Sequence, residues 1–460
     1  MLFSSLSFLL GFLPVSLILY FISKNRLYRN IILLILSVAF YAWGEPKTLW
    51  LIIIVILFNY FIGIKIEEEN NNKLYLIIGI VFNASLLFFF KYFNFFIVDL
   101  LQIRQEYLNI ILPLGISFYT FKNISYLADI YNNKTQAEKN LLNFSNFVLM
   151  FPQFIAGPIV RYETIKEELV DRNENLQSFS DGLRRFIIGL GKKIIIANNL
   201  AIISDKIFYE VSLNELTTLL AWVGAISYTL QIYYDFSGYS DLAIGIAKMF
   251  GFNFEENFNY PYIAKTVQEF WRRWHISLSF WFRDYIYIPL GGSRVNTIRW
   301  IFNLFVVWAL TGLWHGASFT FILWGLYFGI ILLLEKFILK KLLKDIPIVH
   351  QILTILIFII GWIIFNSNSI TQVLAFIKNM FIINGSFSLN ALNNLGILYL
   401  WPYILIGLIG CTPIIANLLN KLNKKPITGL MVDAYLFSIL IISLILMVNS
   451  SYVTFIYFKF

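Results

Sequence analysis

Residues 310–325 read LTGLWHGASFTFILWG, an apolar stretch in which His315 is the one ionisable side chain. Basic residues flank it on both sides, and the positive-inside rule places both flanks on the cytoplasmic side of a membrane. These residues are Arg294, Arg299, Lys336, Lys340, Lys341 and Lys344. The segment between them is therefore predicted to be a helical hairpin with its turn near LWHGAS. About 16 residues separate Arg299 from His315, or about 24 Å of helix rise, which places the histidine deep in the membrane.

The composition also predicts a membrane protein. Of the 460 residues, 59% are hydrophobic and 13% are charged, whereas soluble domains are about 45–50% apolar and about 25% charged. Apolar segments are spread evenly, so we expect one integral membrane domain over residues 1–460. The net charge of +9 comes mostly from short loops, where basic residues set topology and contact anionic lipid headgroups. It does not indicate a nucleic acid partner.

The predicted fold is an all-α polytopic membrane protein with about eleven transmembrane helices and one or two re-entrant helices, because each span needs about 20 apolar residues. The apolar run 5–22 lacks the positive start of a secretory signal and is followed by basic residues. It is interpreted as a retained first span with its N-terminus outside. WGEPK at 43–47 is expected to separate two helices. Residues 181–200 pair basic residues with an apolar face, which fits an interfacial helix or an ordinary span.

The chemistry expected at His315 is acyl transfer. A lone histidine on an apolar face is more often a core residue, but an ionisable group this deep, beside Gly316, favours a functional site. One cysteine, Cys411, and three dispersed histidines give no expectation of a disulfide or a bound metal. A thioester is already activated, so its transfer mainly needs a base for the acceptor hydroxyl. Neutral imidazole, with a reference pKa of about 6.5, suits that role.

A second polar cluster lies at 269–294 and reads EFWRRWHISLSFWFRDYIYIPLGGSR. So many charges cannot face lipid. One interpretation is an interfacial segment with an aromatic belt and snorkelling arginines. The other is a re-entrant element lining a cytoplasmic pocket, whose arginines bind the phosphates of an anionic cosubstrate. Asp235 and Asp241, in an otherwise apolar run, need partners, and a salt bridge from at least one of them to these arginines is expected.

Six stretches spread over nearly the whole chain carry a further pattern. They are PLGISFYTF (113–121), FPQFIAGPIVRY (151–162), DFSGYSDLAIGIAKMFGF (235–252), NFNYPYIAKTVQEFWRRWHISLSFWFRDYIYIPLGGSR (257–294), LTGLWHGASFTFILWG (310–325) and the C-terminal FIYFKF. Together they resemble the membrane-bound O-acyltransferase (MBOAT) superfamily, in its alginate and peptidoglycan O-acetyltransferase branch. One departure is Lys122, where the resemblance leads us to expect glutamine, at a position without a catalytic role.

The resemblance implies a ring of helices around a cytoplasmic funnel, in a multi-pass protein of the bacterial cytoplasmic (inner) membrane. It makes His315 the catalytic histidine and His275 a second catalytic candidate. Candidate substrate or tunnel residues around them are Trp314, Gly316, Trp271, Arg272, Arg273, Trp274, Arg283, Asp284, Asp235 and Ser237. The implied acyl donor is acetyl-CoA or an acyl carrier protein, used as a cosubstrate without a permanently bound cofactor. An extracytoplasmic acetyltransferase partner that resembles SGNH hydrolases then esterifies a cell-wall or exopolysaccharide sugar.

Several alternatives stay open. The acceptor is peptidoglycan or alginate, and D-alanyl transfer to teichoic acid is a further alternative within the superfamily. A proton-coupled transporter comes from a different class, although no internal repeat supports it, and a passive scaffold for a periplasmic transferase is a third. The aromatic tail 450–460 is either an interfacial anchor or a segment that returns to the tunnel, where Tyr457 relays the acyl group.

Overall fold

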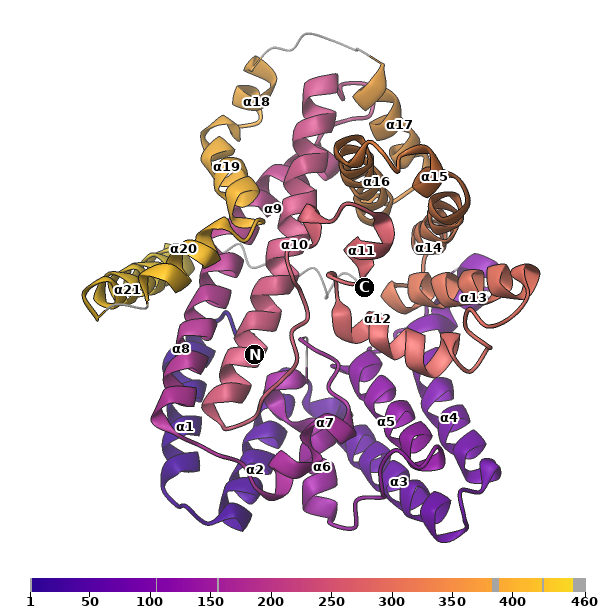
Figure 1. The fold of residues 1–460 in the computed structure, drawn as a ribbon, viewed down its shortest axis with the longest axis vertical. Helices are drawn as coiled ribbons and strands as arrows, with labels where there is room; N and C mark the ends of the chain where they lie inside the picture. Colours follow the sequence, from indigo (N-terminus) through magenta and orange to yellow (C-terminus); the bar gives the residue numbers. More distant parts are fainter. Residues whose placement is uncertain (1, 105, 155–156, 383–388, 424–425, 450–460) are drawn as a thin grey trace. The chain divides into compact units, whose positions relative to one another are not determined.

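The computed structural model describes residues 2–104, 106–154, 157–382, 389–423 and 426–449, and all regular secondary structure within them is helical (Figure 1). The chain divides into two compact units. The first comprises Met1–Phe186, Ser240–Glu256 and Arg283–Ile286, and the second comprises Ile187–Tyr239, Asn257–Phe282 and Tyr287–Phe460. The 32-residue helix α10 (Thr218–Met249) contributes residues to both units.

Eight helices among the described residues are long and apolar enough to cross a membrane. They are Arg26–Gly44, Pro46–Glu68, Lys73–Tyr92, Leu176–Glu210, Thr297–His315, Phe319–Leu342, Pro347–Asn366 and Ile427–Asn449. A ninth would be the pair Leu398–Gly410 and Ile414–Leu422, which is bent by 71°. The predicted class of a polytopic all-helical membrane protein is confirmed, whereas the total of about eleven crossings stays a prediction.

Three stretches explain most of the difference between the eight spans observed and the eleven or so predicted. Ser7–Phe21 and Ile370–Phe381 are apolar but shorter, at 10–17 residues each. Helix α10 is long, but it carries Asp235, Asp241 and Lys248. In contrast, Leu176–Glu210 is a single apolar helical segment of 35 residues, which favours the ordinary span over the interfacial helix for residues 181–200.

The first unit holds seven complete α-helices among its described residues. They are α1 (Leu13–Phe21), α2 (Arg26–Gly44), α3 (Leu49–Glu68), α4 (Lys73–Leu87), α5 (Ile116–Tyr131), α6 (Leu141–Leu149) and α7 (Tyr162–Val170). The predicted break at WGEPK is confirmed, because Pro46 starts a short 3₁₀ turn between α2 and α3. Helices α3, α4 and α5 pack side by side (Figure 1). Gly63 and Gly79 allow this approach, since a Cβ at either position would overlap Tyr126 or Leu127 of α5.

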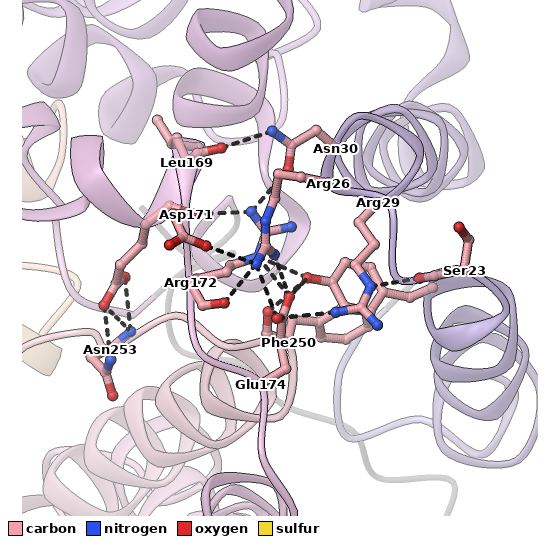
Figure 2. A network of polar contacts seen from close by, with 12 residues as sticks. Ser23, Arg26, Arg29, Asn30, Leu169, Asp171, Arg172, Glu174, Phe250 and Asn253 are labelled. Atoms are coloured by element: carbon pink, nitrogen blue, oxygen red, sulfur yellow. Dashed lines mark hydrogen bonds and ion pairs between the residues drawn. The ribbon is translucent and has the colours of Figure 1, made fainter.

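A polar network in the first unit connects the start of α2 with the loop after α7 (Figure 2). The Glu174 carboxylate lies 2.5 Å from Arg26, 3.0 Å from Arg29 and 3.3 Å from Arg172. The Tyr20 hydroxyl lies 2.8 Å from the same carboxylate. Because the Glu174 side chain is only 7% exposed, these ion pairs are shielded from water and differ from ordinary surface pairs.

The second unit contains the remaining α-helices apart from α10, which both units share. They are α9 (Asn198–Asp205), α11 (Val267–Trp271), α12 (Ile276–Phe282), α13 (Thr297–His315), α14 (Phe319–Leu334), α15 (Lys340–Leu342), α16 (Pro347–Asn366), α17 (Ile370–Phe381), α18 (Asn390–Asn394), α19 (Trp401–Gly410), α20 (Ile414–Leu422) and α21 (Pro426–Asn449), while α8 (Leu176–Gly191) begins in the first unit and ends in the second. The core of the second unit is built largely from aromatic side chains. Trp362 of α16 packs on Trp274 with ring centroids 4.7 Å apart.

Candidate active site

Helices α13 and α14 form a hairpin in the second unit (Figure 1). Helix α13 ends at His315 and α14 starts at Phe319, so the predicted turn at LWHGAS is confirmed. The two helices cross at Gly312 and Gly325, where a Cβ would overlap the backbone carbonyl of Phe321 or Trp308. The small residues therefore bring the two backbones into direct contact and fix where the turn, and His315, lie.

His315 is buried in an aromatic environment. The residue is only 8% exposed. The ring centroids of Trp314, Trp324 and Phe365 lie 4.9, 5.0 and 5.1 Å from the imidazole, all at steep angles. Gly316, the next residue, lets the Phe321 ring approach the backbone closely, because a Cβ there would overlap that ring. This arrangement keeps bulk water away from the imidazole.

His275 lies at the junction between α11 and α12 and is 2% exposed. Its backbone has φ +44°, a left-handed conformation that few residues other than glycine adopt. Its ring contacts Phe236 at 5.0 Å and Trp314 at 5.8 Å between centroids. Because Trp314 also contacts the His315 ring, the structure brings both predicted histidines to one tryptophan.

Two other tryptophans of this segment belong to the packed core. Trp271 lies 4.8 Å from Trp308 and 4.9 Å from Phe328, measured between ring centroids. Trp274 packs between Trp362 and Phe270. The segment thus supports the hairpin α13–α14 and positions His275 against it.

The charged candidates of the second cluster are distributed over both units. Arg273 pairs with Glu269 at 2.9 Å, and Arg272 is exposed. Both arginines belong to the second unit, whereas Arg283 and Asp284 belong to the first. The segment 269–294 is therefore no single helix, but two short helices, a π-helical turn and a loop.

Asp284 is held by two arginines of the first unit. Its carboxylate lies 2.6 Å from Arg283 and 2.8 Å from Arg161. Burial raises the pKa of this carboxyl, but hydrogen bonds from Arg283 and Arg161 outweigh that effect and lower it. The group is therefore an anion at neutral pH.

Asp235 and Asp241 have basic partners on the long helix 176–210. Asp235 lies 2.5 Å from Lys193, and both side chains are almost fully buried. Asp241 lies 2.6 Å from Arg185. These ion pairs differ from the expected pairing with arginines of 269–294. The reason is that α10 packs against this helix, with Gly238 close to the Gly189 carbonyl.

Two candidate residues complete the comparison with the sequence. Ser237 is 1% exposed, and its hydroxyl has no hydrogen-bond partner among the described residues. Tyr457 lies outside the described residues. Sequence reasoning missed Lys193 and also Asn257, which hydrogen-bonds to His275. Lys193 could have been found, because a lysine in an apolar helix needs a partner for its charge. No sequence signal singles out Asn257.

Comparison with known proteins places this arrangement in a family. Residues 136–377 match the model of the membrane-bound O-acyltransferase (MBOAT) family. The chain is 43% identical over 405 residues to the probable alginate O-acetylase AlgI of Pseudomonas aeruginosa, covering 85% of this chain and 77% of that protein. It is 38% identical over 426 residues to the peptidoglycan O-acetyltransferase of Helicobacter pylori, covering 84% and 80%.

A third relative is more distant. The teichoic acid D-alanyltransferase of Bacillus subtilis is 30% identical over 243 residues, which cover 50% of this chain and 61% of that protein. The matched family range 136–377 includes both histidines and the hairpin that carries His315. With its apolar helices, the chain is a multi-pass membrane acyltransferase that acts on a hydroxyl group. It belongs to the membrane-bound O-acyltransferase family.

Proposed function

We propose that this chain is an O-acetyltransferase of the bacterial cytoplasmic membrane, which moves acetyl groups from a cytoplasmic thioester towards an extracytoplasmic sugar. The observation that carries the proposal is the position of His315, which is buried at the turn of the α13–α14 hairpin with Trp314 in contact with both its ring and that of His275. The alginate and peptidoglycan relatives, matched over most of the chain, support an acetyl group and a polysaccharide acceptor.

In this proposal His315 is the general base. Its imidazole takes the proton of the acceptor hydroxyl while the hydroxyl oxygen forms a bond to the thioester carbonyl carbon. The tetrahedral intermediate then collapses, the carbon–sulfur bond breaks, and the leaving thiolate receives the proton from the imidazolium. The products are an acetyl ester and a free thiol, so atoms and electrons balance without a further co-reactant.

The donor in this proposal is acetyl-CoA or an acyl carrier protein on the cytoplasmic side. Arg272 is exposed and Arg273 is partly exposed in the loop between α11 and α12. Guanidinium groups bind phosphate oxygens in bidentate fashion. These two arginines are therefore the candidates for contact with the phosphate groups that both donors carry.

The acceptor side requires a partner. The expected partner is an extracytoplasmic acetyltransferase that resembles SGNH hydrolases and completes the transfer to the polysaccharide. If the acetyl group passes through a covalent relay, Tyr457 is the candidate acceptor, and its replacement by phenylalanine should abolish extracellular acetylation. Full acetylation in the Tyr457→Phe variant would exclude that relay while leaving direct transfer intact.

The decisive experiment is His315→Ala in the native host. We expect O-acetyl groups on muropeptides or exopolysaccharide, measured by mass spectrometry, to fall by about 100-fold or more, because a general base contributes about 100- to 10,000-fold. His350→Gln is the matched control, because His350 is the third histidine of the chain. It lies on α16, where its Nε2 atom is 3.6 Å from the Glu335 carboxylate. Unchanged acetylation at normal protein level would exclude His315 as the base.

The same strains separate the family alternatives. Loss of acetyl groups from muropeptides identifies peptidoglycan as the acceptor, and loss from an exopolysaccharide identifies an alginate-type polymer. A fall in teichoic acid D-alanine with normal acetylation would instead assign the chain to D-alanyl transfer. A proton-coupled transporter is less well supported, because Asp235 and Asp241 form ion pairs with Lys193 and Arg185.

A further inference from the structure

Asn257 contacts three consecutive residues at the start of α12. Its backbone carbonyl accepts a hydrogen bond from the Ile276 N–H at 2.9 Å. Its side-chain oxygen lies 3.2 Å from the Nδ1 atom of His275 and accepts from both the N–H and the hydroxyl of Ser277, at 3.3 and 2.9 Å. Asn257 is fully buried, at 0% exposure, so water does not compete for these groups.

These contacts determine which atoms carry protons. A backbone N–H can only donate, so the Asn257 atom that faces Ser277 must be the amide oxygen and not the nitrogen. The same oxygen faces Nδ1 of His275. An oxygen without a hydrogen can only accept, and the hydrogen bond therefore requires a proton on Nδ1. In a neutral imidazole the other nitrogen, Nε2, then carries a lone pair.

The Nε2 atom of His275 is buried and has no hydrogen-bond partner among the described residues. Phe236 and Trp314 contact the ring, as does Phe258 with its centroid 6.2 Å away. Buried polar atoms of proteins are nearly always hydrogen-bonded, so an exception needs an explanation. One explanation is a substrate hydroxyl that is present only during turnover and then donates a hydrogen bond to the lone pair of Nε2.

We propose that Asn257 is a positioning residue that holds His275 in the Nδ1–H tautomer, so that its Nε2 accepts a hydrogen bond from a bound hydroxyl. This inference rests on the proposed acyltransferase function of the two histidines. It excludes an alternative role for neutral His275, in which Nε2–H would donate a hydrogen bond to the oxyanion of the tetrahedral intermediate. His275 therefore acts on the hydroxyl side of the reaction.

The backbone of His275 supports the same conclusion. Its φ of +44° is costly for a residue other than glycine, and such conformations persist where the surroundings hold them in place. The Asn257 contacts to residues 275, 276 and 277 supply that restraint. The left-handed backbone and the amide together orient the ring.

The first experiment reads the tautomer directly and does not depend on activity. The protein, labelled with ¹⁵N-histidine and reconstituted in lipid, contains three histidines, and His275→Ala identifies the signals of His275. We expect a protonated Nδ1 and an unprotonated Nε2 for this residue, because ring nitrogens with and without hydrogen differ strongly in ¹⁵N chemical shift. A protonated Nε2 with a bare Nδ1 in the wild-type protein would overturn the proposal.

The second experiment compares three variants for acetyl transfer. Asn257→Leu removes the acceptor oxygen and should lower kcat by about 10- to 100-fold, part of what a general base contributes. Asn257→Asp keeps an acceptor oxygen and should retain more activity. Ser277→Ala is the matched control, since it removes a hydrogen bond to the same oxygen without altering His275, and it should stay within about 3-fold of wild type.

Asn257→Asp also carries a pH signature. A carboxylate beside Nδ1 favours the charged imidazole, so the acid limb of the rate profile should move to higher pH. The titratable and charged groups on the elements around His275 include His315 and Arg299 of α13, Asp235 with its partner Lys193, Glu269 with Arg273, and Arg272. Because these groups are the same in both proteins, the shift reports on residue 257.

Four results would be decisive. Equal losses in Asn257→Leu and Ser277→Ala, or a pH profile of Asn257→Asp identical to that of the wild type, would reduce Asn257 to a structural residue and overturn the proposal. An additional loss when Asn257→Leu is combined with His275→Ala would also overturn it, because the two residues should act as a unit. Full acetylation by His275→Ala would instead remove His275 from the proposed function, while the tautomer assignment would stand.

Discussion

Replacing Glu174 with glutamine should destabilise the first unit by about 3–5 kcal/mol, the usual effect of removing one partner from a buried ion pair. The reason is that Arg172 is fully buried at its side chain and Arg29 is 9% exposed, so water cannot replace the lost carboxylate (Figure 2). Asp171 provides a matched comparison, because it is 94% exposed and lies 3.4 Å from Arg26. Its exposed pair should contribute only about 0–1 kcal/mol.

The assay is thermal unfolding of the purified protein in detergent, followed by tryptophan fluorescence. For a unit of 150–250 residues, 1 kcal/mol corresponds to about 2–4 °C in the midpoint. Glu174→Gln should therefore lower the midpoint by about 6–20 °C, and Asp171→Asn by less than about 4 °C. Equal midpoints for the two variants would refute the reasoning, because burial would then not determine the strength of the network.

The pH dependence of the stability difference between the wild type and Glu174→Gln tests whether that difference is electrostatic. Burial raises the pKa of Glu174, but hydrogen bonds from Arg26 and Tyr20 outweigh this and hold it below the usual 4.5. Because the folded pKa is depressed, the stabilisation is fully present above the unfolded value and is lost as pH falls through the folded one. The gap between wild type and Glu174→Gln should close in that acid range. A gap independent of pH would indicate a packing effect.

Two further predictions concern the second unit. Gly325→Ala should destabilise it by about 1–3 kcal/mol, as overpacking does, because the new Cβ overlaps the rigid Trp308 carbonyl. The control is Gly11→Ala in the first unit, where a Cβ would meet nothing within 4 Å, and it should keep the wild-type thermal midpoint or raise it slightly. Lys193→Met should cost about 3–5 kcal/mol by leaving the buried Asp235 without this partner, and adding Asp235→Asn should restore most of the midpoint and of the monodisperse yield. A double variant no more stable than the single one would show that the charge is not the cause.

Local signals in the sequence were enough for the hairpin that carries His315. Basic residues on both flanks predict that both ends lie on the same side of the membrane, and the segment between them can return to that side only through a turn. The prolyl break between α2 and α3 was predictable for a similar reason, since Pro46 cannot continue a helix. These features depend on residues close together in the chain.

The partners of the buried charges were not predictable in this way. At least one of Asp235 and Asp241 was expected to pair with an arginine of 269–294, and the structure pairs them with Lys193 and Arg185. The close approach at Gly238 decides this pairing, and it depends on how two helices pack. A sequence shows that a buried carboxylate needs a partner, but not which of several basic residues the packing will bring to it.

The sequence by itself determined the membrane class and the family, and it singled out two histidines as candidates, because apolar length, charge placement and local motifs are properties of short segments. The tertiary structure alone decided that Trp314 contacts both imidazoles and that the Asn257 oxygen faces Nδ1 of His275. Asn257 lies 18 residues before His275, and its amide resembles any other asparagine in the sequence. Only the backbone path around α12, which presents the Ser277 N–H and the His275 ring to one oxygen, defines which nitrogen holds the proton.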